Sequence, residues 1–301
     1  MKVFLQKILF PYGLILLAIL AASVLVYYFF VISGASNWPT WALWGLPIGL
    51  SYLLLHVIGQ RLFRGFSFSQ RLLQLFTPEV FLTFVSLAVL AVICFQPLAK
   101  SLRYNFGHVL RLKSINELKP YQTTDFLEAD DWYVDRMRVI PFHYYELGSG
   151  SQIGKIELNT LLIVPIFARK DAYATAAKAW LGFRYSDYIS ISEYRAKRIQ
   201  KEREHINSSI GHFSKINVRD FNYLEAMPRS QGGEILQAMA LNHSYYKSEY
   251  SNVYLGQQVE RDVLSLYYLK YSFFLLFLIG LPVSLLACGL IYVLLKAKKL
   301  L

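Results

Sequence analysis

The sequence predicts a polytopic α-helical membrane protein with four transmembrane helices, three near the N-terminus and one near the C-terminus. One extracytoplasmic α+β domain is predicted between the third and fourth helices. The chain of 301 residues is 55% hydrophobic and only 17% charged, which is too apolar for an ordinary soluble domain. Its apolar residues gather in long charge-free runs, and basic residues lie at the ends of these runs.

The first two helices are predicted within one long apolar run. No Asp, Glu, Lys or Arg occurs between Ile8 and Gln60, and a bilayer core requires only about 20 apolar residues per helix. Gly, Asn and Pro in the segment 34–39 favour a reversal of the chain, so we expect helices near Ile8–Ser33 and Trp41–Gly59. The first run is too long for a signal peptide, whose apolar region contains about 7 to 15 residues.

Two further charge-free runs complete the set of four helices. One covers Val80–Ala99 and the other covers Tyr271–Leu295, and each is long enough to cross a bilayer. We therefore expect a membrane region in residues 1–99, an extracytoplasmic domain in residues 100–270, and a last helix with a basic tail in residues 271–301.

The orientation follows from the basic residues of the short loops, because Lys and Arg near the ends of spans stay in the cytoplasm. Four alternating helices place all of these residues on one side and the long segment 100–270 on the other. We therefore expect cytoplasmic termini and an extracytoplasmic domain. The basic residues concerned are Lys2, Lys7, Arg61, Arg64, Arg71, Lys296, Lys298 and Lys299.

The net charge of +11 does not indicate a nucleic-acid partner. Residues 100–270 contain 23 Lys and Arg and 19 Asp and Glu, so most of the basic excess belongs to the membrane region. The lipid bilayer and a protein that binds the outer domain are the partners we expect, and nucleic acid is not.

The two cysteines, Cys94 and Cys288, lie inside predicted membrane helices. The outer domain therefore has no disulfide, no thiol nucleophile and no cysteine-based metal site. A domain without disulfides outside the cytoplasm favours the bacterial periplasm. We expect the protein in the bacterial inner membrane.

Strands are predicted in the first half of the outer domain. The runs Arg136–Leu147 and Gln152–Asn159 read as a hairpin, and Thr160–Phe167 reads as a strand in which Pro165 favours an edge position or a bulge. Lys178–Phe183 and Tyr188–Ser192 read as a further strand pair.

Helices are predicted in the second half. Glu193–Ile206 follows Ser192, which is a plausible cap, and a second helix fits Gly233–Leu241. A third runs from Gln257 into the last membrane helix. Strands followed by helices indicate an α+β domain.

The densest group of candidate ligands is acidic. Grouped carboxylates bind hard cations such as calcium, although the spacing matches no EF-hand loop and acidic residues before a strand are more often exposed turn residues. The group consists of Asp125, Glu128, Asp130, Asp131 and Asp135.

Other residues give weaker signals for chemistry. Gly148–Ser151 lacks the strand-to-helix turn of a serine nucleophile, and none of the six histidines stands at a recognised ligand spacing. His56 lies within the second helix, but close to its cytoplasmic end. We predict no catalytic residue and no cofactor.

Three functions remain open. The sequence favours a non-enzymatic envelope protein whose outer domain binds a protein partner, as an accessory subunit or as a binding or immunity factor. The first alternative is a membrane enzyme that acts on lipid or envelope polymer through the acidic group. The second is a component of an oligomeric pore or transporter, although Gln96, His56 and scattered Ser and Thr give little polar lining.

Overall fold

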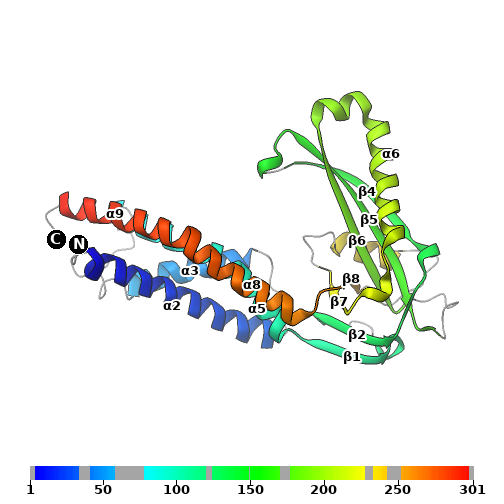
Figure 1. Ribbon diagram of the computed structural model, residues 1–301, viewed down its shortest axis with the longest axis horizontal. Helices are drawn as coiled ribbons and strands as arrows, with labels where there is room; N and C mark the ends of the chain where they lie inside the picture. Colours follow the sequence, from blue (N-terminus) through cyan, green and yellow to red (C-terminus); the bar gives the residue numbers. More distant parts are fainter. Residues whose placement is uncertain are drawn as a thin grey trace. The chain divides into compact units, whose positions relative to one another are not determined.

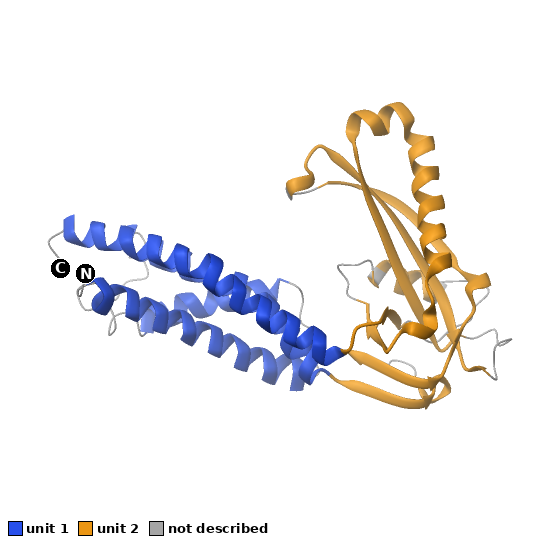
Figure 2. Ribbon diagram, in the orientation of Figure 1, with its two compact units in different colours: residues 1–107, 261–301 blue, residues 108–260 orange. Residues whose placement is uncertain are grey.

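A computed structural model of the chain describes residues 4–33, 41–57, 78–119, 124–148, 150–169, 177–227, 233–242 and 252–297. The chain divides into two compact units (Figures 1 and 2). Unit 1 contains residues 1–107 and 261–301, and unit 2 contains residues 108–260.

Unit 1 is helical. Its first helix is continuous through η1 (Leu5–Leu9), α2 (Phe10–Tyr27) and η2 (Tyr28–Ser33), and its last is continuous through α8 (Arg261–Leu275), η10 (Leu276–Gly280) and α9 (Leu281–Ala297). Between them lie α3 (Ala42–Val57) and α5 (Pro78–Phe106).

Three helices of the described residues are long and apolar enough to cross a membrane, namely Leu5–Ser33, Pro78–Phe106 and Arg261–Ala297. Each contains one of the predicted apolar runs and extends beyond it. The second predicted span, Trp41–Gly59, corresponds to α3, a shorter apolar helix of 16 residues. The predicted reversal at 34–39 and the residues after Val57 lie outside the described residues.

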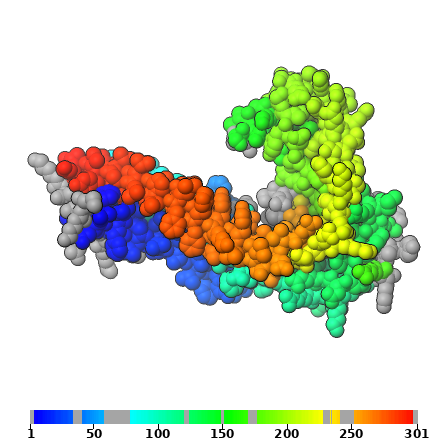
Figure 3. Space-filling view, in the orientation of Figure 1, coloured from blue at the N-terminus to red at the C-terminus, as the bar shows by residue number. Residues whose placement is uncertain are grey.

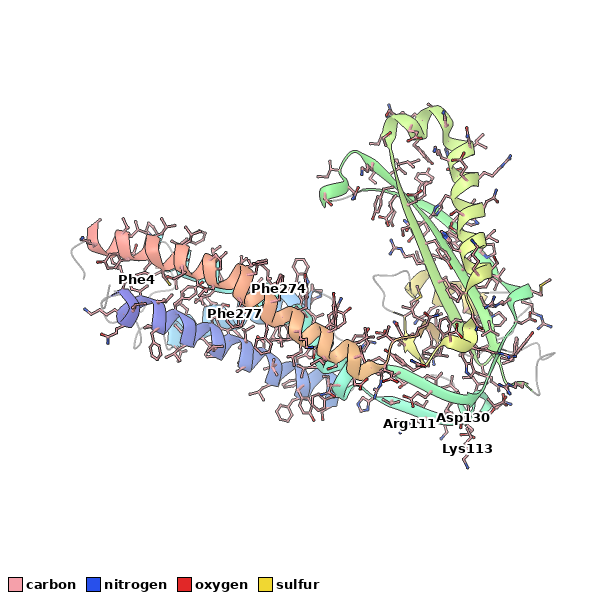
Figure 4. All side chains as sticks on the ribbon, in the orientation of Figure 1. Phe4, Arg111, Lys113, Asp130, Phe274 and Phe277 are labelled. Carbon is pink, nitrogen blue, oxygen red and sulfur yellow. The ribbon has the colours of Figure 1, made fainter. Side chains whose placement is uncertain are left out.

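The surface of unit 1 is apolar enough to face lipid. Large apolar side chains point outward on every long helix, including Phe10 at 65% exposure and Leu286 at 68%. Phe274 and Phe277, labelled in Figure 4, belong to the same set. Soluble proteins rarely expose so many large apolar side chains together, so this unit is a membrane-embedded region.

Helices α5 and α8 are joined by hydrogen bonds between side chains and backbone. Ser101 donates to the carbonyl oxygen of Ser265 at 2.8 Å, and Ser265 donates back to that of Ser101 at 3.0 Å. Nearer the C-terminal end of α8, Ser272 donates to the carbonyl oxygen of Cys94 at 2.8 Å. Small residues allow this close approach of helix backbones in membranes.

Unit 2 is built on a mixed eight-stranded sheet with the order β1-β2-β7-β8-β6-β5-β3, in which β4 also pairs with β5. The two longest strands, β5 and β6, are antiparallel over almost their whole length. The strands are β1 (Val109–Ser114), β2 (Phe126–Asp131), β3 (Tyr133–Val134), β4 (Ile140–Leu147), β5 (Lys155–Phe167), β6 (Ala179–Ser190), β7 (Tyr223–Ala226) and β8 (Val253–Gln257).

Two helices cover this sheet. The long helix α6 (Ile191–Lys215) runs back along β5 and β6 (Figure 1) and packs Phe213 against Phe183 with ring centroids 5.1 Å apart. The short helix α7 (Gly233–Asn242) packs Leu236 against Trp180 on the other face. The sheet is therefore buried on both faces where it is widest.

The sheet has two parts of different character. We call one part the base. It consists of β1, β2, β7, β8, residues 161–167 of β5 and residues 179–183 of β6. In these stretches of β5 and β6 nearly every side chain is buried. We call residues 140–160 and 184–206 the arm, which contains β4, the other halves of β5 and β6, and the first half of α6. In the space-filling view the end of the β4–β5 hairpin projects from the body of unit 2 (Figure 3).

The edge position predicted for Pro165 is wrong, because β5 is an interior strand. It has β6 on one side and both β3 and β4 on the other. Pro165 lies opposite Trp180, whose N–H points to β8, so the backbone of Pro165 points to the opposite side. There the pairing passes from β4 to β3, and the missing N–H of proline leaves no gap in a ladder.

Three local predictions are also corrected. Residues 178–192 do not form two strands, because β6 is continuous from Ala179 to Ser190. The cap of α6 is Ser190, whose hydroxyl accepts a hydrogen bond from the N–H of Glu193 at 3.2 Å. Residues Arg136–Arg138 form a short 3-10 helix, η5, and the predicted strand begins at Ile140.

Candidate functional site

The five acidic candidates lie on β2 and on the segments beside it. Most of them form a hydrogen bond or an ion pair with another residue of unit 2. Asp125 accepts a hydrogen bond from the N–H of His108 at 3.2 Å. Asp131 lies 3.8 Å from the guanidinium of Arg169. Asp135 accepts from the N–H of Met137 at 3.0 Å and forms an ion pair with Arg138 at 2.9 Å.

The remaining two acidic residues face basic residues on the neighbouring strand. Glu128 lies opposite Arg111 and forms an ion pair with it at 2.8 Å. Lys113 lies between two positions that are opposite Ala129 and Asp131, which places it opposite Asp130 (Figure 4). Oppositely charged cross-strand pairs stabilise a sheet modestly and compensate its charge.

These contacts give four of the five acidic side chains partners within unit 2. Within the described ranges, no three His, Cys, Asp or Glu side chains come together in a way that could hold a metal ion.

The arm presents a sheet edge. Of the strands that the structure describes, β4 pairs with β5 alone, through all eight of its residues. An unpaired edge offers a row of backbone N–H and C=O groups to any other extended chain.

The backbone groups that point outward from β4 can be identified. The N–H of Gly148 donates to the carbonyl oxygen of Lys155 at 2.9 Å, and residues of an antiparallel pair alternate between facing the partner and facing away. The alternate positions Leu147, Tyr145 and His143 therefore present both N–H and C=O at the edge. Pro141 presents only its C=O.

Apolar and aromatic side chains accompany this edge. Leu147 is 74% exposed and Tyr145 is 51% exposed, and both lie on the face that α6 covers. Phe142, which is 38% exposed, points to the opposite face. Natural edge strands are usually protected by charged residues or proline, and β4 carries only Pro141 and Glu146 in this role.

The α6 face of the arm is held by an aromatic cluster. Tyr145 and Tyr194 have ring centroids 5.6 Å apart, and the guanidinium of Arg198 lies 5.3 Å from the ring of Tyr145 and 5.6 Å from that of Tyr194. Tyr194 donates to Glu202 at 2.8 Å. Burial is the main cause that raises the pKa of Tyr194 to about 12, and the Glu202 carboxylate contributes to the same increase.

The opposite face of the arm carries a polar network between β5 and β6. Arg184 donates to Glu157 at 2.8 Å and to Asn159 at 3.1 Å. Ser186 donates to Asn159 at 2.7 Å. These bonds join the two strands where the apolar core of the base ends, so the arm keeps its shape without a second covering helix.

Two histidines lie between the arm sheet and α6. His143 and Thr160 are joined by a hydrogen bond of 2.9 Å, and burial lowers the pKa of the His143 imidazole. Burial also lowers the pKa of His205, while the Asp187 carboxylate opposes this shift and His143 adds to it. This part of the arm therefore favours neutral histidines.

Comparisons with known proteins do not assign a function. No protein-family model matches the sequence, and the comparisons with curated proteins and with solved structures likewise give no match. The function of the chain is inferred from its own residues.

The hairpin that contains β4 is predicted by the sequence, but its position at the edge is not. The strand order depends on pairing between residues far apart in the chain, such as Trp180 with Val253. The spacing of Tyr145 and Leu147, two positions apart, is the one local signal, since large apolar residues at alternating positions favour a strand with one covered face.

Proposed function

We propose that the protein is a membrane-anchored binding protein of the cell envelope whose unit 2 binds a protein partner along the edge of β4. The observation that carries this proposal is an eight-residue edge strand with outward backbone groups and exposed apolar side chains on both faces. In β-strand addition, backbone hydrogen bonds give affinity and the alternating side chains give specificity.

The partner segment is an extended strand that carries apolar residues and carboxylates. Apolar residues match Leu147 and Tyr145, because both are exposed beside the free edge. Carboxylates match the part of α6 in the arm, residues 191–206, which contains five Lys and Arg but only three Glu. Complementary charge accelerates association and selects the partner more than it increases affinity.

The membrane part of the proposal has four spans, with α3 as the second, cytoplasmic termini and unit 2 outside the cytoplasm. Basic residues at both termini and in the segment 58–77 support this orientation. The inner membrane of a bacterium is the expected location. In this arrangement unit 2 is tethered at both ends and faces other envelope proteins.

Cysteine labelling tests the orientation. Both native cysteines are buried, so a single introduced cysteine at exposed Arg111→Cys reports its side of the membrane. A membrane-impermeant maleimide should label it in intact cells of the source bacterium or in spheroplasts. Labelling that requires lysis would contradict an extracytoplasmic unit 2.

The partner-binding proposal is tested with two variants at one position. Tyr145→Pro removes the side chain and an outward N–H, whereas Tyr145→Ala removes the side chain alone. Neither variant loses a hydrogen bond to β5. Tagged full-length protein is purified in mild detergent, and the partner is identified by mass spectrometry.

We expect the wild type to retain a stoichiometric partner and Tyr145→Ala to bind it more weakly, because the side chain is lost. Tyr145→Pro should bind it at least about tenfold more weakly than Tyr145→Ala, because it also loses a backbone hydrogen bond and introduces a ring at the interface. Equal retention by Tyr145→Pro and Tyr145→Ala would show that the edge of β4 is not the binding surface. Recovery of no partner by the wild type would contradict the proposal as a whole.

A further inference from the structure

A second candidate site lies in the base of unit 2, away from the edge of β4. It is a surface pocket of about 700 Å³ between the segment from Trp132 to Met137, the C-terminal end of α6, and the short 3-10 helix η8 (Val218–Asp220). This volume is within the usual range of about 300–1,000 Å³ for small-molecule sites.

The lining of the pocket is strongly basic. Four cationic side chains line it, from Arg136, Arg169, Lys215 and Arg219, against the single carboxylate of Asp135. Asp135 is already paired with Arg138 at 2.9 Å, so its negative charge compensates Arg138, which does not line the pocket.

Arg136 is fixed in place without being neutralised. Its guanidinium donates to the carbonyl oxygens of Ser214, at 3.2 Å, and Ile216, and lies 5.9 Å from the ring centroid of Phe213. Both acceptors are neutral backbone groups at the end of α6, so the positive charge is held at the pocket. A guanidinium presents five N–H donors, and only two of its nitrogens are engaged by these contacts.

The other three cationic side chains that line the pocket are held less firmly than Arg136. Lys215 and Arg219 are exposed, and Arg169 has its side chain 72% exposed beside Asp131. Arginine and lysine together bind phosphate and carboxylate groups through charge-assisted hydrogen bonds. Asp131 partly compensates Arg169, which leaves Arg136, Lys215 and Arg219 for a ligand, so a ligand with several negative charges fits better than one with a single charge.

We propose that this pocket binds a soluble polyvalent oxyanion of the phosphate or polycarboxylate class. The aromatic side chains of Trp132 and Phe221, which also line the pocket, form apolar walls beside the charges. The site is independent of the β4 edge, so each proposal can fail without the other.

Isothermal titration of the full-length protein in an uncharged detergent tests the site with two probes, pyrophosphate and citrate. We expect at least one probe to bind with a dissociation constant below about 1 mM, and the binding to weaken as salt is added. The absence of binding by both probes at this concentration would overturn the proposal.

A matched pair of double variants locates the binding. Lys215→Gln with Arg219→Gln removes two pocket charges from exposed side chains, whereas Arg195→Gln with Arg203→Gln removes two exposed charges from α6 outside the pocket. We expect the first pair to weaken binding about tenfold and the second to change it less than about twofold. Equal effects of the two pairs would overturn the pocket as the site.

A third titration separates a soluble ligand from a lipid headgroup, which has the same phosphate chemistry. Mixed micelles that contain phosphatidylglycerol are compared with pyrophosphate. Binding of pyrophosphate at the pocket that such micelles do not displace supports the soluble ligand. Binding of the micelles alone would overturn it.

Discussion

The base and the arm of unit 2 share the strands β5 and β6 but use them differently. In the base, Leu161, Trp180 and Leu181 are fully buried between α6 and α7. In the arm, the same strands carry Glu157, Asn159 and Arg184 on one face, and the aromatic cluster of β4 and α6 lies on the other. The buried core therefore lies in the base, and the free edge of β4 lies in the arm.

The largest expected effect is the loss of a core side chain in the base. Trp180→Ala should destabilise unit 2 by about 3–5 kcal/mol, because Trp180 is fully buried and its removal leaves a cavity. Hydrogen exchange of the β5 and β6 amides in the full-length protein measures the change. As a matched control in the arm, Leu147→Ala should change stability by no more than about 0.5 kcal/mol. Similar losses from both variants would remove the distinction between base and arm.

A smaller effect is expected from overpacking the base. A Cβ on Gly182 would lie 2.7 Å from the Sδ of Met227 and 2.7 Å from the Cγ1 of Val253. Gly182→Ala should therefore cost about 1–3 kcal/mol, because the neighbouring side chains must move within a packed core. Thermal unfolding measures this cost, and an unchanged midpoint would show that the packing around Gly182 is loose.

Within the arm, the polar network should matter more than the exposed apolar residues. Glu157→Gln weakens the ion pair with Arg184, whose two side chains are 14% and 24% exposed, and should cost about 1–2 kcal/mol. Glu146→Gln removes a neighbouring exposed carboxylate and serves as the control. Hydrogen exchange at β6 compares them, and equal protection in both variants would show that the network does not support the arm.

The smallest effect is a dependence of stability on pH. The folded arm lowers the pKa of His143 and His205 from their ordinary value of 6.5. As pH falls below 6.5, the unfolded chain takes up protons before the folded chain does, so folding stability declines until the folded-state pKa values are passed. The midpoint of thermal unfolding should therefore decrease between neutral pH and the acidic side of 6.5.

The double variant His143→Gln with His205→Gln is the control for this dependence. It should lose part of the difference between the two pH values, because neither glutamine titrates. A double variant with the full pH dependence of the wild type would assign the effect to other groups.

The contrast between the two units also explains what could be predicted from the sequence. The apolar helices of unit 1 can be predicted because lipid requires long charge-free runs, and each predicted run lies within a described helix apart from the two ends of the second. In unit 2, Gly233–Leu241 and the β4–β5 hairpin are predicted well because they depend on local patterns.

The errors in unit 2 occur where distant pairing decides the structure. β6 looks like two strands because Arg184, Ser186 and Asp187 interrupt its apolar pattern, yet the first two are hydrogen-bonded to β5. The strands β1, β2, β7 and β8 were not predicted, because they are short and pair across long stretches of sequence. The ion pair of Glu128 with Arg111 on the neighbouring strand likewise depends on pairing that the local sequence does not show.

Site-specific photo-cross-linking in living cells tests the central claim, that the edge of β4 binds a protein partner. A benzophenone amino acid is placed at Leu147 or Phe142 on the edge, and at Arg111 in the base as a control. We predict one cross-linked partner from both edge positions and none from Arg111, and loss of that product when Tyr145→Pro is added. A product that persists with Tyr145→Pro, or that arises only from Arg111, would contradict the claim.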